Sequence, residues 1–183
     1  MIEIRLHGRG GQGSVIASKI LAVAAFEEGN WVQSFPKFGV ERRGAPVEAF
    51  LRISRGKILI RSEVTEPDFV VVLDPSLVEV IDFTAGLKKN GAILINTPLT
   101  PDELQLPDTF NVTCVDASRI AAEHGLGSPT SPIVNTAICG AFAKSSGLVG
   151  IDAVCRAIRD EVPIKPEKNS AAAEAAYAST IFN

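Results

Sequence analysis

IEIRLHGRGGQG, residues 2–13, is the stretch of sequence that decides the fold. Apolar and charged residues alternate over its first half, as in a strand with one buried face. Four glycines among the last six residues then allow backbone angles and close approaches that other residues resist. From Ser14 onwards the apolar residues recur at helical spacing, and a helix is expected to end near Gly29. The stretch therefore predicts a first strand, a glycine loop and a helix.

The glycine loop is a candidate site for an anion. It satisfies the pattern GxGxxG between an expected strand and an expected helix, and the free amide groups at a helix N-terminus attract phosphate. Two other interpretations remain open: the glycines serve only the tight packing of strand against helix, or a segment of a partner docks on the loop. The candidate cofactor-binding residues are Gly8, Gly10, Gly11, Gln12 and Gly13.

The next strand argues against a nicotinamide dinucleotide at this loop. Such a site needs an Asp or Glu about 20 residues after the glycines to hold the ribose hydroxyls. The second expected strand, residues 31–35, is followed by Pro36 and has no carboxylate at its end. An oxidoreductase domain that uses NAD is therefore disfavoured.

Composition and charge are typical of an ordinary globular protein. The length of 183 residues suits one α/β domain, so residues 1–183 are expected to form a single domain. A net charge of -3 gives no case for nucleic acid, and no apolar run approaches the roughly 20 residues that cross a bilayer. The first strand begins at once and leaves no room for a signal peptide, so a cytoplasmic location is expected. Scattered cysteines disfavour an iron–sulfur or zinc site and predict buried, reduced thiols at Cys114, Cys139 and Cys155.

The rest of the chain predicts a three-layer α/β/α fold with a mostly parallel, mixed sheet. Residues 47–53 and 58–60 are expected to pair as an inserted β-hairpin, where a doubly wound fold would place a helix. Further strands are expected at the apolar runs 69–74, 92–96 and 112–115. Helices are expected to carry Leu77 to Ile81, to cover residues 117–123, to run from Ser131-Pro132 to Gly147, to begin with Asp152 as the cap, and to begin at Pro166.

Candidate catalytic residues are scarce. His7 precedes the glycine loop, where it either touches a ligand or packs at the end of a strand, and His124 suits a structural place at a helix end. Asp74 ends a strand, where α/β sheets bind ligands, and would serve equally well as a helix cap. Since no nucleophile–base pair, metal motif or carboxylate pair stands out, no catalytic or metal-binding residue is assigned.

A second candidate binding segment follows the second strand. PKFGVERRGAP, residues 36–46, has neither helical nor strand period, and surface loops of this kind often carry binding. Arginine beside an aromatic residue is typical of interface hot spots. Because the segment follows a strand end, we expect it at the same end of the sheet as the glycine loop. Its candidate partner-binding residues are Phe38, Glu41, Arg42 and Arg43.

Both motifs resemble the gamma subunit of 2-oxoacid:ferredoxin oxidoreductases. The resemblance lies in HGRGGQG at residues 7–13 and in FPKFGVERRGAP at residues 35–46, whose ERRGAP form is similar to the pyruvate and ketoisovalerate type. NTAICGA, residues 135–141, resembles a later helix segment of the family, with Cys139 where an aliphatic residue is usual.

The resemblance implies a subunit without an active site of its own, in a complex that oxidatively decarboxylates a 2-oxoacid, here expected to be pyruvate, to acyl-coenzyme A and reduces ferredoxin. Thiamine diphosphate would lie between the alpha and beta subunits, and iron–sulfur clusters in the beta and delta subunits. Coenzyme A phosphates would reach the glycine loop. The alpha, beta and delta subunits are then the expected partners, with ferredoxin met through the complex. The alternative is a free-standing binding module for a nucleotide-like or phosphate-bearing ligand.

Overall fold

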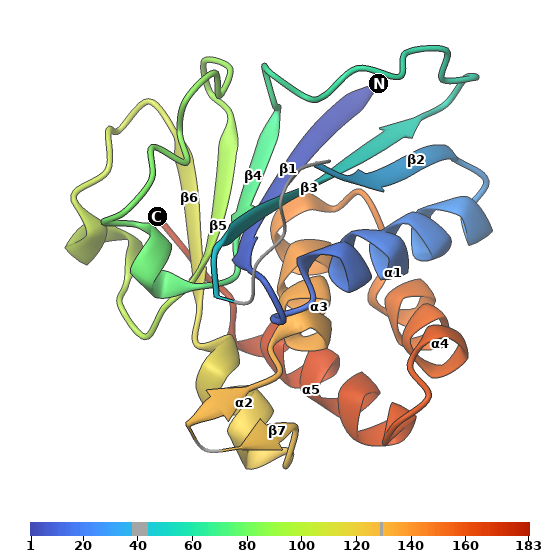
Figure 1. The fold of residues 1–183 in the computed structure, drawn as a ribbon, viewed down its shortest axis with the longest axis vertical. Helices are drawn as coiled ribbons and strands as arrows, with labels where there is room; N and C mark the ends of the chain where they lie inside the picture. The colour runs from blue at the N-terminus through green and yellow to red at the C-terminus, as the bar shows by residue number, and fades with distance from the viewer. Residues whose placement is uncertain (38–43, 129) are drawn as a thin grey trace.

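The computed structural model describes residues 1–37, 44–128 and 130–183 (Figure 1). Its centre is a seven-stranded sheet with the order β2-β3-β1-β4-β5-β6-β9. A separate two-stranded ladder is formed by β7 (Gly127–Ser128) and β8 (Ser131–Pro132). The strands of the large sheet are β1 (Ile2–Arg9), β2 (Trp31–Pro36), β3 (Pro46–Ser54), β4 (Phe69–Val72), β5 (Ala92–Asn96), β6 (Asn111–Val115) and β9 (Ile181–Phe182).

The sheet is parallel at its centre and antiparallel at its edges. β1, β4, β5 and β6 run parallel to one another, whereas β3 lies antiparallel to both β1 and β2, and β9 antiparallel to β6. All four residues of β4 are buried, as expected for an apolar run in the middle of a sheet. The α/β class and the mixed sheet with a parallel core are thus confirmed.

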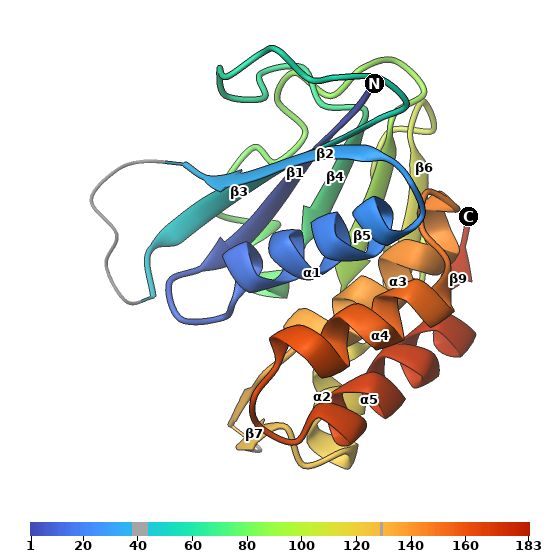
Figure 2. The ribbon, with the colours of Figure 1, turned by 90° about the vertical axis from the view of Figure 1, so that its right-hand side faces the viewer.

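The α-helices gather on one face of the sheet (Figures 1 and 2). Apolar residues of β1, such as Ile4 and Leu6, share one buried cluster with Ile20 of the first helix and Phe142 of the third. Within the described residues, no helix has the length and hydropathy needed to cross a bilayer. The helices are α1 (Ser14–Glu27), α2 (Ala117–Glu123), α3 (Asn135–Ser146), α4 (Ile151–Glu161) and α5 (Pro166–Ser179).

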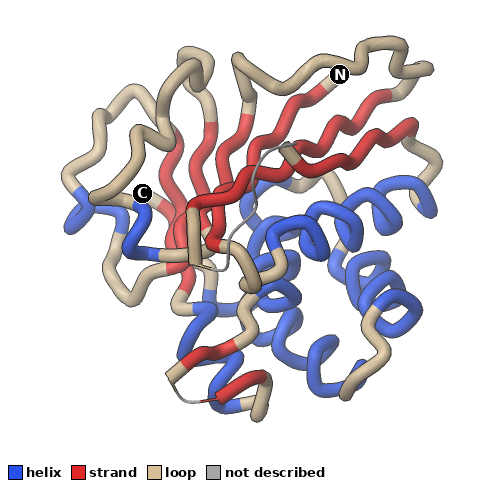
Figure 3. Tube along the Cα trace, viewed as in Figure 1, coloured by secondary structure: helices blue, strands red, loops and turns tan. Residues whose placement is uncertain are grey.

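The opposite face carries short turns in place of a second layer of α-helices (Figure 3). Its buried cluster, which includes Val70 and Ile93, is covered by the 3-10 turns η1 (Pro75–Leu77) and η2 (Pro101–Leu104) and by loops. The expected helix over Leu77 to Ile81 does not form. The backbone here makes hydrogen bonds of the 3-10 type, from the Leu77 N–H to the Asp74 carbonyl oxygen and from the Val78 N–H to the Pro75 carbonyl oxygen. Val80 is 61% exposed and adds no apolar contact that would extend a helix over the sheet. The expected three-layer α/β/α arrangement is therefore corrected to a sheet that has α-helices on one face and short turns on the other.

The inserted hairpin pairs differently from the expectation. β3 is bordered by β1 and β2, so both of its edges are occupied and residues 58–60 form no strand. The hairpin therefore consists of β2 and β3. The carbonyl oxygen of Ile60 accepts a hydrogen bond from the side chain of Gln33 in β2, with Nε2 at 3.0 Å.

Two helix starts differ from the expectation and two boundaries are confirmed. Ser131 and Pro132 belong to β8, so α3 begins only at Asn135. Gly150 is the N-cap of α4, and Asp152 lies inside the first turn. The C-cap of α3 at Gly147 and the start of α5 at Pro166 are as expected.

Candidate functional site

The chain changes from one half of the sheet to the other between β1 and β4. After β1 it builds β2 and β3 on one side, and then β4, β5 and β6 on the other. The carboxyl ends of the parallel strands β1 and β4 therefore open next to each other, at the kind of point where α/β sheets bind ligands. The glycine loop follows β1 and Asp74 follows β4, so two candidate features meet at this point.

Two glycines of the loop adopt backbone angles that favour glycine. Gly11 has φ +95°, and an added Cβ there would meet no described atom within 4 Å. Gly13, the N-cap of α1, has φ +83°, and an added Cβ would lie 2.5 Å from Asn135 Nδ2. Within residues 1–37, 44–128 and 130–183, Gly11 is thus unobstructed, whereas Gly13 is packed against α3.

Gly8 and Gly10 join the loop to its neighbours. An added Cβ at Gly8 would lie 3.2 Å from Ser14 Cβ, so the strand end and the helix start are in close contact. Gly10 donates its N–H to the carbonyl oxygen of Ala45 at 2.9 Å and accepts from the N–H of Gly44 at 3.1 Å. The segment that leads into β3 is therefore held against the glycine loop.

Gln12 ties the loop to the end of β4. Its Oε1 accepts the backbone N–H of Arg9 at 2.8 Å, and its Nε2 donates to the Asp74 carboxylate. Arg9 reinforces the connection, because its Nη2 donates to Ser76 Oγ at 2.8 Å and its Nε lies 3.5 Å from Asp74 Oδ2. The shape of the loop is thus set by polar contacts that span the two central strands.

Asp74 acts as both a cap and an anchor. Its Oδ1 accepts from the Ser76 N–H at 2.9 Å and from Ser76 Oγ at 2.6 Å, which caps the turn η1. Burial alone would raise the pKa of Asp74, but the hydrogen bonds from Ser76 and Gln12 and the charge of Arg9 prevail and lower the pKa. Asp74 therefore remains ionised at neutral pH, and an anion is favoured on the α1 side of the loop, away from this carboxylate.

The N-terminus of α1 supplies that favourable side. Its first hydrogen bond of the α-helical pattern runs from the Ala17 N–H to the Gly13 carbonyl oxygen at 2.9 Å, so the three preceding N–H groups have no acceptor within the helix. Because the N-cap is a glycine, no side chain caps this end among the described residues. A helix start of this kind binds phosphate or carboxylate.

The two histidines are structural. His7 is buried, and its Nε2 accepts from Arg5 Nε at 3.0 Å. Burial first, and the nearby charge of Arg5 second, lower the pKa of His7 to about 4, so the ring is neutral at neutral pH. His124 Nδ1 lies 2.8 Å from the carbonyl oxygen of Ile120 at the end of α2. Of the two interpretations of His7, packing at the strand end is the one the structure supports.

The cysteines are buried, as expected, and none forms a disulfide within the described part of the chain. Burial raises the pKa of the Cys114 thiol to about 12 and also raises the pKa values of Cys139 and Cys155. Residues 1–37, 44–128 and 130–183 contain no group of three His, Cys, Asp or Glu side chains that could hold a metal ion. The thiols are therefore poor ligands and poor nucleophiles in the folded chain.

The second candidate segment can be placed only by its flanks, since Phe38, Glu41, Arg42 and Arg43 lie outside the described residues. On one side the Lys37 N–H donates to the Glu48 carbonyl oxygen at 2.9 Å. On the other side the carbonyl oxygen of Gly44 accepts from Arg9 Nη1 at 3.0 Å. The segment thus begins at the carboxyl end of β2 and ends against the glycine loop.

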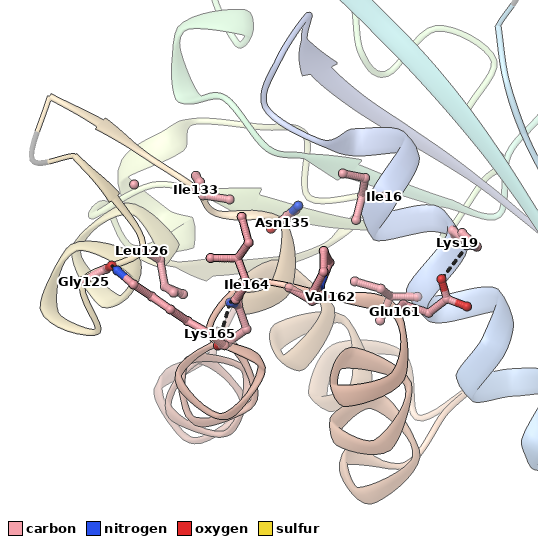
Figure 4. Close-up of a pocket in the computed structure, with 14 residues that line it drawn as sticks. Ile16, Lys19, Gly125, Leu126, Ile133, Asn135, Glu161, Val162, Ile164 and Lys165 are labelled. Atoms are coloured by element: carbon pink, nitrogen blue, oxygen red, sulfur yellow. Dashed lines mark hydrogen bonds and ion pairs between the residues drawn. The ribbon is translucent and has the colours of Figure 1, made fainter.

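Sequence reasoning missed a pocket of about 360 Å³ beside α1 (Figure 4). Asn135 lines the pocket and also contacts Gly13, so it connects the pocket to the glycine loop. The available signal was a polar residue at the start of the mostly apolar run 135–143. The apolar lining includes Ile16, Ile20, Leu126, Ile133, Val162 and Ile164.

Comparison with known proteins gives consistent matches along nearly the whole chain. The family described as pyruvate ferredoxin/flavodoxin oxidoreductase matches residues 3–179. The "Pyruvate/ketoisovalerate oxidoreductases common subunit gamma" of Pyrococcus abyssi is 53% identical over 186 residues, which cover 98% of this chain and 97% of that protein. The "Pyruvate synthase subunit PorC" of Methanocaldococcus jannaschii is 52% identical over 178 residues, 97% of this chain and 96% of that one. The crystal structure of the pyruvate oxidoreductase subunit PORC from Thermotoga maritima superposes with a TM-score of 0.83 at 33% identity, covering 100% of this chain and 98% of the other.

Proposed function

The chain belongs to the pyruvate ferredoxin/flavodoxin oxidoreductase family, and from this premise we propose how it contributes to the enzyme. It is a gamma-type subunit of a multi-subunit 2-oxoacid oxidoreductase. The observation that carries this conclusion is identity above 50% over almost the full length of proteins named as such subunits. It speaks against a free-standing binding module.

We infer that the subunit supports catalysis without catalytic residues of its own. Its buried thiols do not suit iron–sulfur ligation, because their pKa values are raised and Cys114, Cys139 and Cys155 are held on different elements. Thiamine diphosphate and the clusters are then held by the alpha, beta and delta subunits, with which this chain assembles in the cytoplasm. The substrate that we propose for the complex is pyruvate.

The glycine loop fits a phosphate group of coenzyme A. The N-terminus of α1 has no side-chain cap among the described residues, and none of their atoms lies within 4 Å of a Cβ added at Gly11. Coenzyme A supplies the thiol that takes up the acyl group. In this proposal the chain's own part is to bind and orient a phosphate at residues 10–13, with Gln12 holding the loop in shape through Asp74.

A matched pair of glycine variants tests this role. Gly11→Val and Gly29→Val both place a branched residue at positive φ, +95° and +84°, with no described atom within 4 Å. Each therefore strains the backbone by about 1–3 kcal/mol, but Gly29 lies at the other end of α1. In the assembled enzyme Gly11→Val should raise the KM for coenzyme A and lower acyl-coenzyme A formation, whereas Gly29→Val should behave as wild type. Equal activity of both variants, with each shown to be incorporated, would mean that the loop only connects strand to helix.

We also propose that segment 36–46 docks on the other subunits. Its C-terminal flank, Gly44 and Ala45, is hydrogen-bonded to the glycine loop, so one partner surface can cover both. Arg42 and Arg43 are suited to a carboxylate or phosphate in a two-pronged contact, with Phe38 as an apolar anchor and Glu41 available for a partner cation.

A charge-matched control makes the docking proposal testable. Replacing Arg42 and Arg43 together by Ala should weaken assembly by at least about 2 kcal/mol, while the Tm of the lone subunit stays nearly constant. Arg55→Ala with Lys57→Ala removes the same charge from an exposed turn after β3, away from the glycine loop, and should leave assembly unchanged. If both double variants assemble as wild type does, the arginines are solvated loop residues and docking lies elsewhere.

A further inference from the structure

The side-chain nitrogen Nδ2 of Asn135 is a hydrogen-bond donor without an acceptor among the described residues. The residue is only 6% exposed. Its Oδ1 accepts the backbone N–H of Thr136 at 2.9 Å, which fixes the orientation of the amide, since a flipped amide would place two donors against each other. Within the described residues, Nδ2 donates to no acceptor. Among the described residues, His7 Nδ1 is the fully buried side-chain nitrogen without a partner, so Asn135 Nδ2 keeps some accessible surface at the pocket that the residue lines, where an acceptor atom of a ligand can meet it.

The free nitrogen lies between the pocket and the start of α1. Nδ2 is so close to Gly13 that a Cβ there would come within 2.5 Å of it. Figure 4 shows Asn135 between Ile133 and the first turn of α1, at the edge of the apolar pocket. An acceptor atom placed here can meet both the Asn135 amide and the N–H groups at the start of α1, which also have no side-chain cap among the described residues.

The far wall of the pocket is held in place by its own hydrogen bonds. Asn169 accepts from Thr136 Oγ1 at 2.8 Å and donates from Nδ2 to the carbonyl oxygens of Ile164 and Lys165, each at 3.0 Å. Lys165 has φ +51° and donates from Nζ to the Gly125 carbonyl oxygen at 2.8 Å. The connection between α4 and α5 is thus fixed against the segment before α3, and the pocket is preformed.

The charge at the rim favours an anion. Lys19 and Lys165 both line the pocket, and the negative charge of Glu161 is balanced by Lys19 at 2.5 Å. The walls are otherwise mainly branched aliphatic side chains, and the volume of about 360 Å³ lies within the range of small-molecule sites.

We propose that this pocket binds a small apolar carboxylate. The carboxylate accepts hydrogen bonds from Asn135 Nδ2 and from the N-terminus of α1, and the hydrocarbon part fills the space between Ile16, Ile133 and Ile164. The carboxylate would use the same N–H groups at the start of α1 as the phosphate proposed above, so the two ligands would compete there. The apolar pocket on the α3 and α5 side is no part of the coenzyme A proposal, and binding in it is tested separately.

Titration of the full-length chain with sodium hexanoate, followed by amide NMR, tests the site. Saturable shifts are expected at the side-chain amide of Asn135 and at the backbone amides of Ser14 to Ile16, and 1-hexanol, which lacks the charge, should bind more weakly. Asn135→Asp replaces the amide donor by a carboxylate, whose negative charge repels that of hexanoate, and should weaken hexanoate binding by roughly tenfold or more. Absence of saturable binding, or equal binding of hexanoate and 1-hexanol, would overturn the proposal.

A surface pair of variants keeps the test valid if Asn135→Asp fails to fold. Ile164 is 71% exposed at the pocket, and Leu59 is 77% exposed on a loop outside it. Ile164→Ala should weaken hexanoate binding severalfold, while Leu59→Ala should not change it. If the two variants bind hexanoate equally well, the hydrocarbon part does not pack against Ile164 as proposed. Because the assay uses this chain alone, failure here leaves the subunit's place in the enzyme unaffected.

Discussion

Replacing Gly13 by alanine perturbs the glycine loop in two ways that can be separated. The backbone has φ +83°, where a residue with a Cβ costs about 1–2 kcal/mol. The new Cβ would also lie 2.5 Å from Asn135 Nδ2 and 3.2 Å from Asn135 Cγ, and overpacking of this kind costs about 1–3 kcal/mol. We therefore expect Gly13→Ala to lower the free energy of unfolding by about 2–5 kcal/mol.

A double-mutant cycle with Asn135→Ala separates the two contributions. In the Asn135→Ala background the amide is absent and only the Cβ of residue 135, at 3.3 Å, stays close, so Gly13→Ala should cost little more than the backbone part, about 1–2 kcal/mol. Gly147→Ala is the control, because Gly147 also has positive φ, +62°, but no described atom lies within 4 Å of an added Cβ. Urea unfolding of the four proteins of the cycle measures the coupling. An equal cost of Gly13→Ala in both backgrounds would refute the contact between the loop and α3.

Three further outcomes follow from the packing and the buried titratable groups. Gly140→Ala should prevent the close packing of α3 against α5, because its Cβ would overlap the carbonyl oxygen of Ala173; a Tm equal to that of wild type would contradict this. The pKa of His7 is about 4 in the fold and about 6.5 in the unfolded chain, so its stabilising effect is complete above pH 6.5 and is lost, by about 3 kcal/mol, as the pH falls through 4. His7→Gln keeps an acceptor for Arg5 and should reduce the pH dependence of the unfolding free energy between pH 4 and 6.5. An unchanged pH dependence would count against the buried neutral ring. The buried cysteines should react with a thiol reagent only after unfolding, and rapid labelling of the native protein would show that they are accessible.

The parts of the fold that depend on local pattern could be predicted from the sequence. The alternation before the glycines and the helical period after them placed β1 and α1, and the continuous apolar run of β4 placed a central strand. The pairing of β3 could not be predicted in the same way, because alternation shows that a residue run is a strand but does not name its neighbour. The run 58–60 is apolar, yet Leu59 is 77% exposed and the edge it was expected to join is occupied by β2.

The candidate site divides in a similar way. GxGxxG lies within one short segment, so its place at the strand end and the positive φ of Gly11 and Gly13 could be anticipated from the residue types. The contacts of Gln12 with Asp74 and of Gly13 with Asn135 join segments far apart in the chain, and no local pattern indicates them. The pocket beside α1 depends on four separate segments and was missed for the same reason.

Purification of the native protein through a tag on this chain, followed by native mass spectrometry and an activity assay, tests the central claim most directly. The account predicts that the chain elutes in an assembly with further subunits, and that the assembly reduces ferredoxin when both pyruvate and coenzyme A are present. Recovery of the chain as a lone 19.4 kDa protein, with the 2-oxoacid oxidoreductase activity intact in fractions that lack it, would contradict its role as a subunit.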